Sequence, residues 1–232
     1  MKKHFKTMKD RPLEERPYEK CLKEGPGILT DGELLAVILR TGAKDCSAVE
    51  LAWDILDKHP VYKGLAGLAH LSPELLKQIP GIGNVKTVQI LCAVELSRRL
   101  SRASLSSEKD FSSPDYIAAY YMEHMRHLEA EKVFLLLLDG RHQLIKEITL
   151  SQGTAGSAYV SVKTIFLEAF RHGAVSIILL HNHPSGWPEP SREDLVLTRQ
   201  VKEAGDLLGI PLTDHIIIGD QCYTSLREQK MM

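Results

Sequence analysis

The sequence predicts an α-helical domain followed by a domain that mixes strands and helices. In residues 31–100, apolar side chains recur near helical spacing behind Asp or Ser residues that favour helix starts. After residue 130, they instead form near-continuous runs such as EKVFLLLLDG and AVSIILLHNHP, which indicate buried strands. The intervening segment at 101–114, SRASLSSEKDFSSP, is rich in Ser and charge and has the composition of a linker. We therefore predict domains at 1–107 and 108–232.

The first domain is predicted to be entirely helical. Asp31, Ser47 and Ser72 each stand at the start of an apolar helical pattern, and Pro73 suits a first helical position. A longer helix, VKTVQILCAVELSRRL, follows the turn PGIGN and extends to about Leu100.

In the second domain, strands and helices alternate after a first helix at 115–127. EKVFLLLLDG and LIKEITLS predict a hairpin, because Asp139-Gly140 is a turn signal between two strand-like runs. YVSVKTIFLEAFRHG is an amphipathic helix that stops at Gly173. A strand (AVSIILLHNHP), a helix (SREDLVLTRQVKEAGDLLG) and another strand (HIIIGD) follow. This order predicts a mixed α/β or α+β domain.

Composition excludes several classes of protein. The 232 residues contain no apolar run that approaches the ~20 residues of a membrane span, and the basic N-terminus lacks the apolar core of a secretory signal. The four cysteines are far apart and form no CxxC pair, which suits a reducing cytoplasm. Residues 1–109 carry 18 Lys/Arg against 14 Asp/Glu, and residues 110–232 carry 11 against 16. We expect a cytoplasmic protein without a membrane partner, whose basic first half permits nucleic-acid binding without requiring it.

The strongest chemical signal is the pair His181 and His183 at the end of a predicted strand. Side chains alternate along a strand, so residues two apart leave the same face. Two neutral imidazoles on one face suit Zn²⁺, and a third protein ligand would leave the fourth position for water. Asp194, eleven residues after His183, is the candidate third ligand. A competing interpretation makes Ser191 and Asp194 a helix-capping pair, and one carboxylate does not easily serve both roles.

The segment HNHPSGWPEPSRED resembles the zinc motif of JAMM (MPN-plus) metalloproteases, in the form HxHP, six residues, SxxD. The wider sequence resembles the bacterial RadC family, through HNHPSG, PSREDLVLTRQ, GDLLGIPLTDHIIIG and, in the first half, ERPYEKCLKEGPGILTDGELLAVILRTG. The resemblance covers nearly the whole chain. It implies a mixed sheet flanked by helices in 108–232, of the JAMM and cytidine-deaminase-like type.

The resemblance also implies one Zn²⁺ per chain, held by His181, His183 and Asp194. It implies a glutamate general base, which we match to Glu147 in LIKEITLSQGT, and assigns Ser191 to hydrogen-bonding the oxyanion. Without the resemblance, Glu147 would be interpreted as a solvated charge on an edge strand. His215 is interpreted as a structural residue or as a support for a ligand, and Trp187 as a wall of the cleft.

The first domain carries a second motif, LSPELLKQIPGIGNVKTVQILCAVELSRR, which resembles a helix–hairpin–helix at about 71–100. Gly81 and Gly83 would let a DNA phosphate approach the backbone, and Lys86 would add a phosphate contact. The alternative is that the glycines simply make a tight turn.

These observations lead to one main functional hypothesis and two rivals. The main hypothesis is a zinc hydrolase that acts on a peptide or isopeptide bond in a protein substrate, with Glu147 activating a zinc-bound water. The first rival is a non-catalytic, DNA-associated accessory protein with structural zinc or none. The second rival, a metal-dependent nuclease, is weaker, because two-metal nucleases gather several carboxylates.

Overall fold

The computed structural model describes residues 12–103, 111–152 and 160–232. The chain divides into two compact units, 1–97 and 98–232, so that the division falls inside a long helix. The predicted boundary at residue 107 lies outside the described residues. Over the described residues, no helix is both long and apolar enough to cross a membrane.

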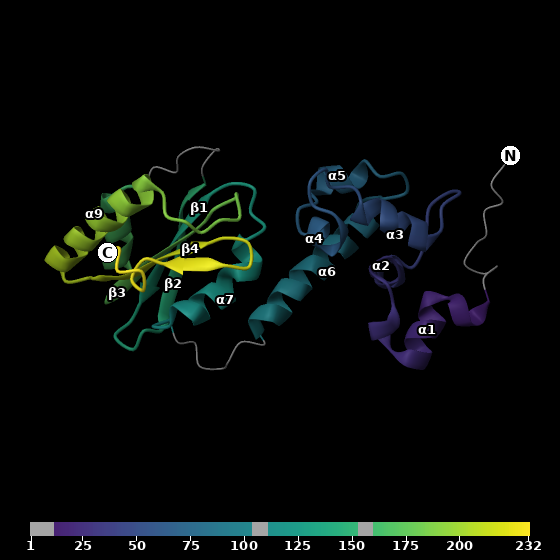
Figure 1. The fold of residues 1–232 in the computed structure, drawn as a ribbon, viewed down its shortest axis with the longest axis horizontal. Helices are drawn as coiled ribbons and strands as arrows, with labels where there is room; N and C mark the ends of the chain where they lie inside the picture. The colour runs from purple at the N-terminus through teal and green to yellow at the C-terminus, as the bar shows by residue number, and fades with distance from the viewer. Residues whose placement is uncertain (1–11, 104–110, 153–159) are drawn as a thin grey trace. The chain divides into compact units, whose positions relative to one another are not determined.

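The first unit is helical, as predicted. Its elements are two 3-10 turns (Leu13–Glu15 and Pro26–Ile28), α1 (Pro17–Glu24), α2 (Asp31–Leu39), α3 (Ala48–Leu56), α4 (Gly64–Leu68), α5 (Pro73–Lys77) and α6 (Asn84–Ala103), which continues past the unit boundary (Figure 1). Capping boxes start two of these helices: Thr30 with Glu33 starts α2, and Ser47 with Glu50 starts α3. Helix α2 begins at Asp31, as predicted, and the residue that caps it is Thr30.

The second unit is a mixed five-stranded sheet with helices on both faces (Figure 1). Its elements are α7 (Pro114–Met125), β1 (Lys132–Leu138), β2 (Leu144–Gln152), α8 (Val162–Arg171), β3 (Ser176–Asn182), α9 (Arg192–Leu208), β4 (Leu212–Ile218) and β5 (Tyr223–Ser225). The strand order is β2-β1-β3-β4-β5, and only β3 and β4 are parallel. The predicted hairpin, helices and strands are thus present, and β5 was not anticipated.

Each face of the sheet has its own core, because successive residues of a strand point to opposite sides. Val133, Leu135 and Leu137 of β1 pack with α8 and α9 on one face. Phe134, Leu136 and Leu138 pack against α7 on the other. We call these the α9 face and the α7 face. Every residue of β1 from Val133 to Leu138 is buried, which is why that strand shows a continuous apolar run rather than an alternating one.

Candidate metal centre

The two histidines lie where β3 ends. His181 is the sixth residue of β3 and pairs with Val133 of β1, so its side chain is on the α9 face. His183 follows the strand, and its backbone N–H still donates to the Ile218 carbonyl of β4 at 2.9 Å. Because the pairing continues to His183, one residue past the end of β3, the alternation of side chains continues too. Both imidazoles therefore point to the same side, as predicted.

Helix α9 brings the third residue to this place. Its inward stripe consists of residues at helical spacing, and the first of them is Asp194, which is 8% exposed. Near its other end the helix approaches the start of β4 closely because Gly205 has no Cβ: an added one would lie 2.6 Å from the Ile210 carbonyl oxygen and 3.3 Å from the Leu212 nitrogen. The Asp194 carboxylate lies within 3.5 Å of both imidazoles at the end of β3.

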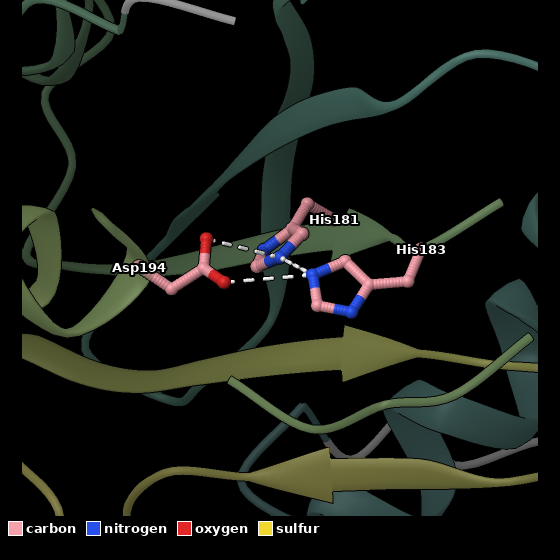
Figure 2. A group of neighbouring side chains, drawn as sticks. All are labelled: His181, His183 and Asp194. Carbon is pink, nitrogen blue, oxygen red and sulfur yellow. Dashed lines mark hydrogen bonds and ion pairs between the residues drawn. The ribbon is translucent and has the colours of Figure 1, made fainter. Parts of the chain in front are cut away.

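Three ligand atoms converge, as Figure 2 shows. The Nε2 atoms of His181 and His183 are 3.0 Å apart, and they lie 3.3 and 3.5 Å from Oδ1 and Oδ2 of Asp194, respectively. A tetrahedral ion bound at ~2.1 Å from each ligand atom separates those atoms by about 3.4 Å. The spacing and the two imidazole donors fit Zn²⁺, whereas Mg²⁺ and Ca²⁺ prefer oxygen ligands.

The electrostatics of the group show how strongly its members interact. Burial opposes ionisation of Asp194, but hydrogen bonds from His181 and His183 outweigh it and hold its pKa well below the ordinary value. The Asp194 carboxylate is also the main reason that the pKa of His183 is raised, with smaller contributions from the Trp187 carbonyl and from the charge of Glu131. A cation at this position would replace the shared protons as the partner of the carboxylate.

Asp194 also takes part in a capping box, while its carboxylate faces both histidines. The Ser191 backbone N–H and hydroxyl both donate to Oδ2 of Asp194, at 2.8 and 2.6 Å, and the Asp194 N–H donates to the Ser191 hydroxyl at 3.1 Å. Oδ1 remains directed at His181. Ser191 therefore orients the carboxylate in this structure, whereas its predicted role toward an oxyanion stays a prediction.

In both histidines, Nδ1, the ring nitrogen that points away from the candidate site, has a hydrogen-bond partner. The His183 Nδ1 lies 2.9 Å from the Trp187 carbonyl oxygen, which leaves Nε2 for the site. The His181 Nδ1 lies 2.9 Å from Nε2 of His215, a fully buried residue of β4. Burial, together with the nearby His181, lowers the pKa of His215 to about 3, so this ring is neutral. Trp187 as a whole is 72% exposed.

Glu147 does not join this group, which contradicts the role we predicted for it. It pairs with Leu136 of β1, so it lies on the α7 face, opposite to His181. There its carboxylate accepts a hydrogen bond of 2.6 Å from the Tyr121 hydroxyl of α7. The resemblance to the JAMM motif led to a glutamate in the β1–β2 hairpin, but a motif does not determine which face of the sheet a residue occupies.

A different glutamate lies on the same face of the sheet as His181. Glu131 precedes β1 by one residue and Val133 by two, which gives it the parity of the α9 face. It is half-buried, and its charge acts on His183. The sequence did contain a signal for this residue: Glu131 begins EKVFLLLL, two residues before Val133, the partner of His181. Recognising it required the β1–β3 register, which the sequence does not state.

Asn182, between the two histidines, fixes the segment around Glu131. Its Oδ1 accepts from the Lys132 N–H at 2.9 Å, and its Nδ2 donates to the carbonyls of Ala130 and Leu128 at 3.2 and 3.4 Å. Both backbone neighbours of Glu131 are therefore bound to a residue flanked by the metal-site histidines. Sequence analysis assigned no role to Asn182.

In the first unit, two helices flank the predicted turn, but Lys86 is directed inward. Its ammonium group donates to the carbonyls of Gly42 and Gly81 at 2.6 and 3.1 Å. Gly81 has φ +88°, and an added Cβ would lie 2.1 Å from the Ala43 Cβ, whereas nothing lies within 4 Å of one at Gly83. Gly81 and Lys86 thus fasten this turn to the 42–43 loop, and DNA binding stays a prediction.

The sequence matches two protein-family models. One, described as a RadC-like JAB domain, matches residues 111–231 and includes the whole metal-site group, and the other, UPF0758 N-terminal, matches residues 8–88. The chain belongs to the RadC family. Its relatives in this family are similar over nearly their full length. A UPF0758 protein of Desulforamulus reducens is 42% identical over 98% of this chain and 99% of its own. UPF0758 proteins of Alkaliphilus metalliredigens and a Geobacillus species are each 44% identical, over 97% and 96% of this chain and 96% and 97% of their own.

Proposed function

We propose that this RadC-family chain is a zinc-dependent hydrolase that cleaves a peptide or isopeptide bond. The convergence of two imidazole nitrogens and a carboxylate at 3.0–3.5 Å from one another carries this proposal, because it fits the spacing of ligands around one tetrahedral ion. The resemblance to JAMM metalloproteases supports the substrate class.

His181, His183 and Asp194 would hold the metal. A zinc ion bound there lowers the pKa of a coordinated water toward neutrality and polarises a carbonyl group. Three protein ligands leave a fourth position for these partners. The hydrogen bonds behind the rings keep both Nε2 atoms directed into the site, and the cap by Ser191 keeps the carboxylate there.

We propose Glu131, rather than Glu147, as the acid–base group. Its carboxylate is on the α9 face beside His183, where it can take a proton from water and return it to the leaving nitrogen. Asn182 would keep the distance between this carboxylate and the histidines constant. A general acid–base group of this kind contributes ~10²–10⁴-fold to the rate.

The test compares two matched substitutions in full-length protein reconstituted with zinc. Elemental analysis gives zinc per chain, and mass spectrometry of a peptide library gives cleavage. We expect about one zinc in the wild type, Glu131→Gln and Glu147→Gln, and much less in His183→Ala. Cleavage should fall at least ~100-fold in Glu131→Gln and stay near the wild-type rate in Glu147→Gln.

Two outcomes would refute the proposal. A wild type that takes up no zinc would exclude the metal centre, and attention would move to the accessory-protein rival, for which a DNA-binding titration of the same samples is the assay. Cleavage that survives Glu131→Gln but not Glu147→Gln would exclude Glu131.

A further inference from the structure

A buried chain of hydrogen bonds connects α9 to the metal site through β4. The Thr198 hydroxyl donates to the Asp194 carbonyl oxygen at 2.6 Å and lies 2.6 Å from Nδ1 of His215. Nε2 of His215 lies 2.9 Å from Nδ1 of His181. Thr198 and His215 are both 0% exposed, so within this chain of contacts solvent does not supply alternative partners.

Counting protons along this chain leaves one arrangement. The Asp194 carbonyl has no proton, so the single hydroxyl proton of Thr198 must point to it at 2.6 Å. The Thr198 oxygen can then only accept, which requires a proton on Nδ1 of His215. In a neutral ring, Nε2 of His215 is then the acceptor, and His181 must donate from Nδ1. A metal binds only a neutral imidazole, and in that form of His181 the lone pair is on Nε2, the atom that faces His183 and Asp194.

The two metal-site histidines differ in how their tautomers are determined. His183 faces a backbone carbonyl, which can only accept, so its Nδ1 must carry the proton. His181 faces an imidazole nitrogen, which either donates or accepts depending on the tautomer of His215. Thr198 removes that ambiguity. It lies one helical turn after Asp194 on α9, so one helix supplies both a ligand and the control of another ligand's tautomer.

We propose that Thr198 and His215 are positioning residues that keep the Nε2 lone pair of His181 directed into the metal site. This inference rests on the proposed zinc centre, but it concerns the tautomer of the neutral His181 ring, which can be measured without metal. Without the hydroxyl, the Nδ1 atom of His215 loses its acceptor and its ring can protonate at Nε2. His181 would then have to protonate at Nε2, the atom that the metal needs.

The test uses Thr198→Val, which removes the hydroxyl while keeping the branched shape, with Thr198→Ser as the matched control that retains it. Long-range ¹⁵N–¹H NMR correlations of the full-length, metal-free protein assign the tautomers of His181 and His215 at a pH where both rings are neutral. Competition with a chromophoric chelator gives the zinc dissociation constant. In the wild type and Thr198→Ser, we expect both rings to carry the proton on Nδ1. In Thr198→Val, we expect mixed tautomers and zinc binding weakened by about 10- to 100-fold.

The two measurements separate the possible failures. A wild-type spectrum with the His181 proton on Nε2 would overturn the proposed proton order without any variant, so the test does not depend on the folding of Thr198→Val. Zinc binding that is equal in Thr198→Val and Thr198→Ser would overturn the role of Thr198. If the wild type binds no zinc, the proposed function fails, whatever tautomers the spectra show.

Discussion

Replacing Asn182 with Ala should separate the stability of the site from its affinity for metal. Asn182 is 1% exposed, and two of its three hydrogen bonds, at 2.9 and 3.2 Å, have ordinary lengths. The third, at 3.4 Å, is weak. Truncation leaves the Lys132 N–H and the Ala130 carbonyl without this partner. Because an unsatisfied buried group costs ~1–3 kcal/mol, we expect the free energy of unfolding to fall by about 2–3 kcal/mol.

Urea denaturation of metal-free protein measures this change, with Asn182→Asp as the control. The aspartate keeps an acceptor for the Lys132 N–H but directs a second oxygen at two carbonyls, so it should restore part of the stability at most. Zinc affinity should change less than about 3-fold in Asn182→Ala, because alternation puts Asn182 on the opposite face from its histidine neighbours. Cleavage should fall by about 10- to 100-fold, because Glu131 is no longer fixed at its distance from the metal.

The reasoning would be refuted if zinc affinity fell in step with stability. That result would mean that Asn182 supports the metal ligands directly rather than the segment around Glu131. A change in unfolding free energy below about 0.5 kcal/mol would equally refute it, since the buried groups would then have found other partners.

Two further predictions concern the metal-free protein and the turn at Gly81. The pKa of Asp194 is below its ordinary 3.8 and that of His183 is above its ordinary 6.5. Their interaction therefore stabilises the fold most between these values, and this contribution is lost as pH falls through the pKa of Asp194 or rises through that of His183. Urea titrations from pH 4 to 9 should show the largest difference between wild type and Asp194→Asn in that window, and a difference independent of pH would contradict it. Gly81→Ala should lower the melting temperature because φ is +88° and the new Cβ meets Ala43. Ala43→Gly should restore part of the loss by relieving the clash, and an unchanged melting temperature in Gly81→Ala would show that the turn tolerates a side chain.

Local patterns in the sequence predicted most of the second unit. The continuous apolar run of β1, the helical spacing of α8 and the Gly stops after α8 and α9 are consequences of burial and backbone conformation that neighbouring residues determine. The same applies to His181 and His183, because strand alternation is a property of two adjacent positions. Asp194 was found by its motif, and local capping chemistry alone would have explained it equally well.

The sequence determined which segments are helices and strands and which two histidines share one face at the end of β3. Only the tertiary structure shows which glutamate shares a face of the sheet with these histidines. A one-residue difference in strand register exchanges the two faces of a sheet, and register depends on partners far away in the chain. For this reason Glu147 lies beside Tyr121 on the α7 face, while Glu131 lies near His183. The same long-range packing brings Thr198 and His215 together, because a tautomer depends on which atoms meet in space rather than on the order of residues.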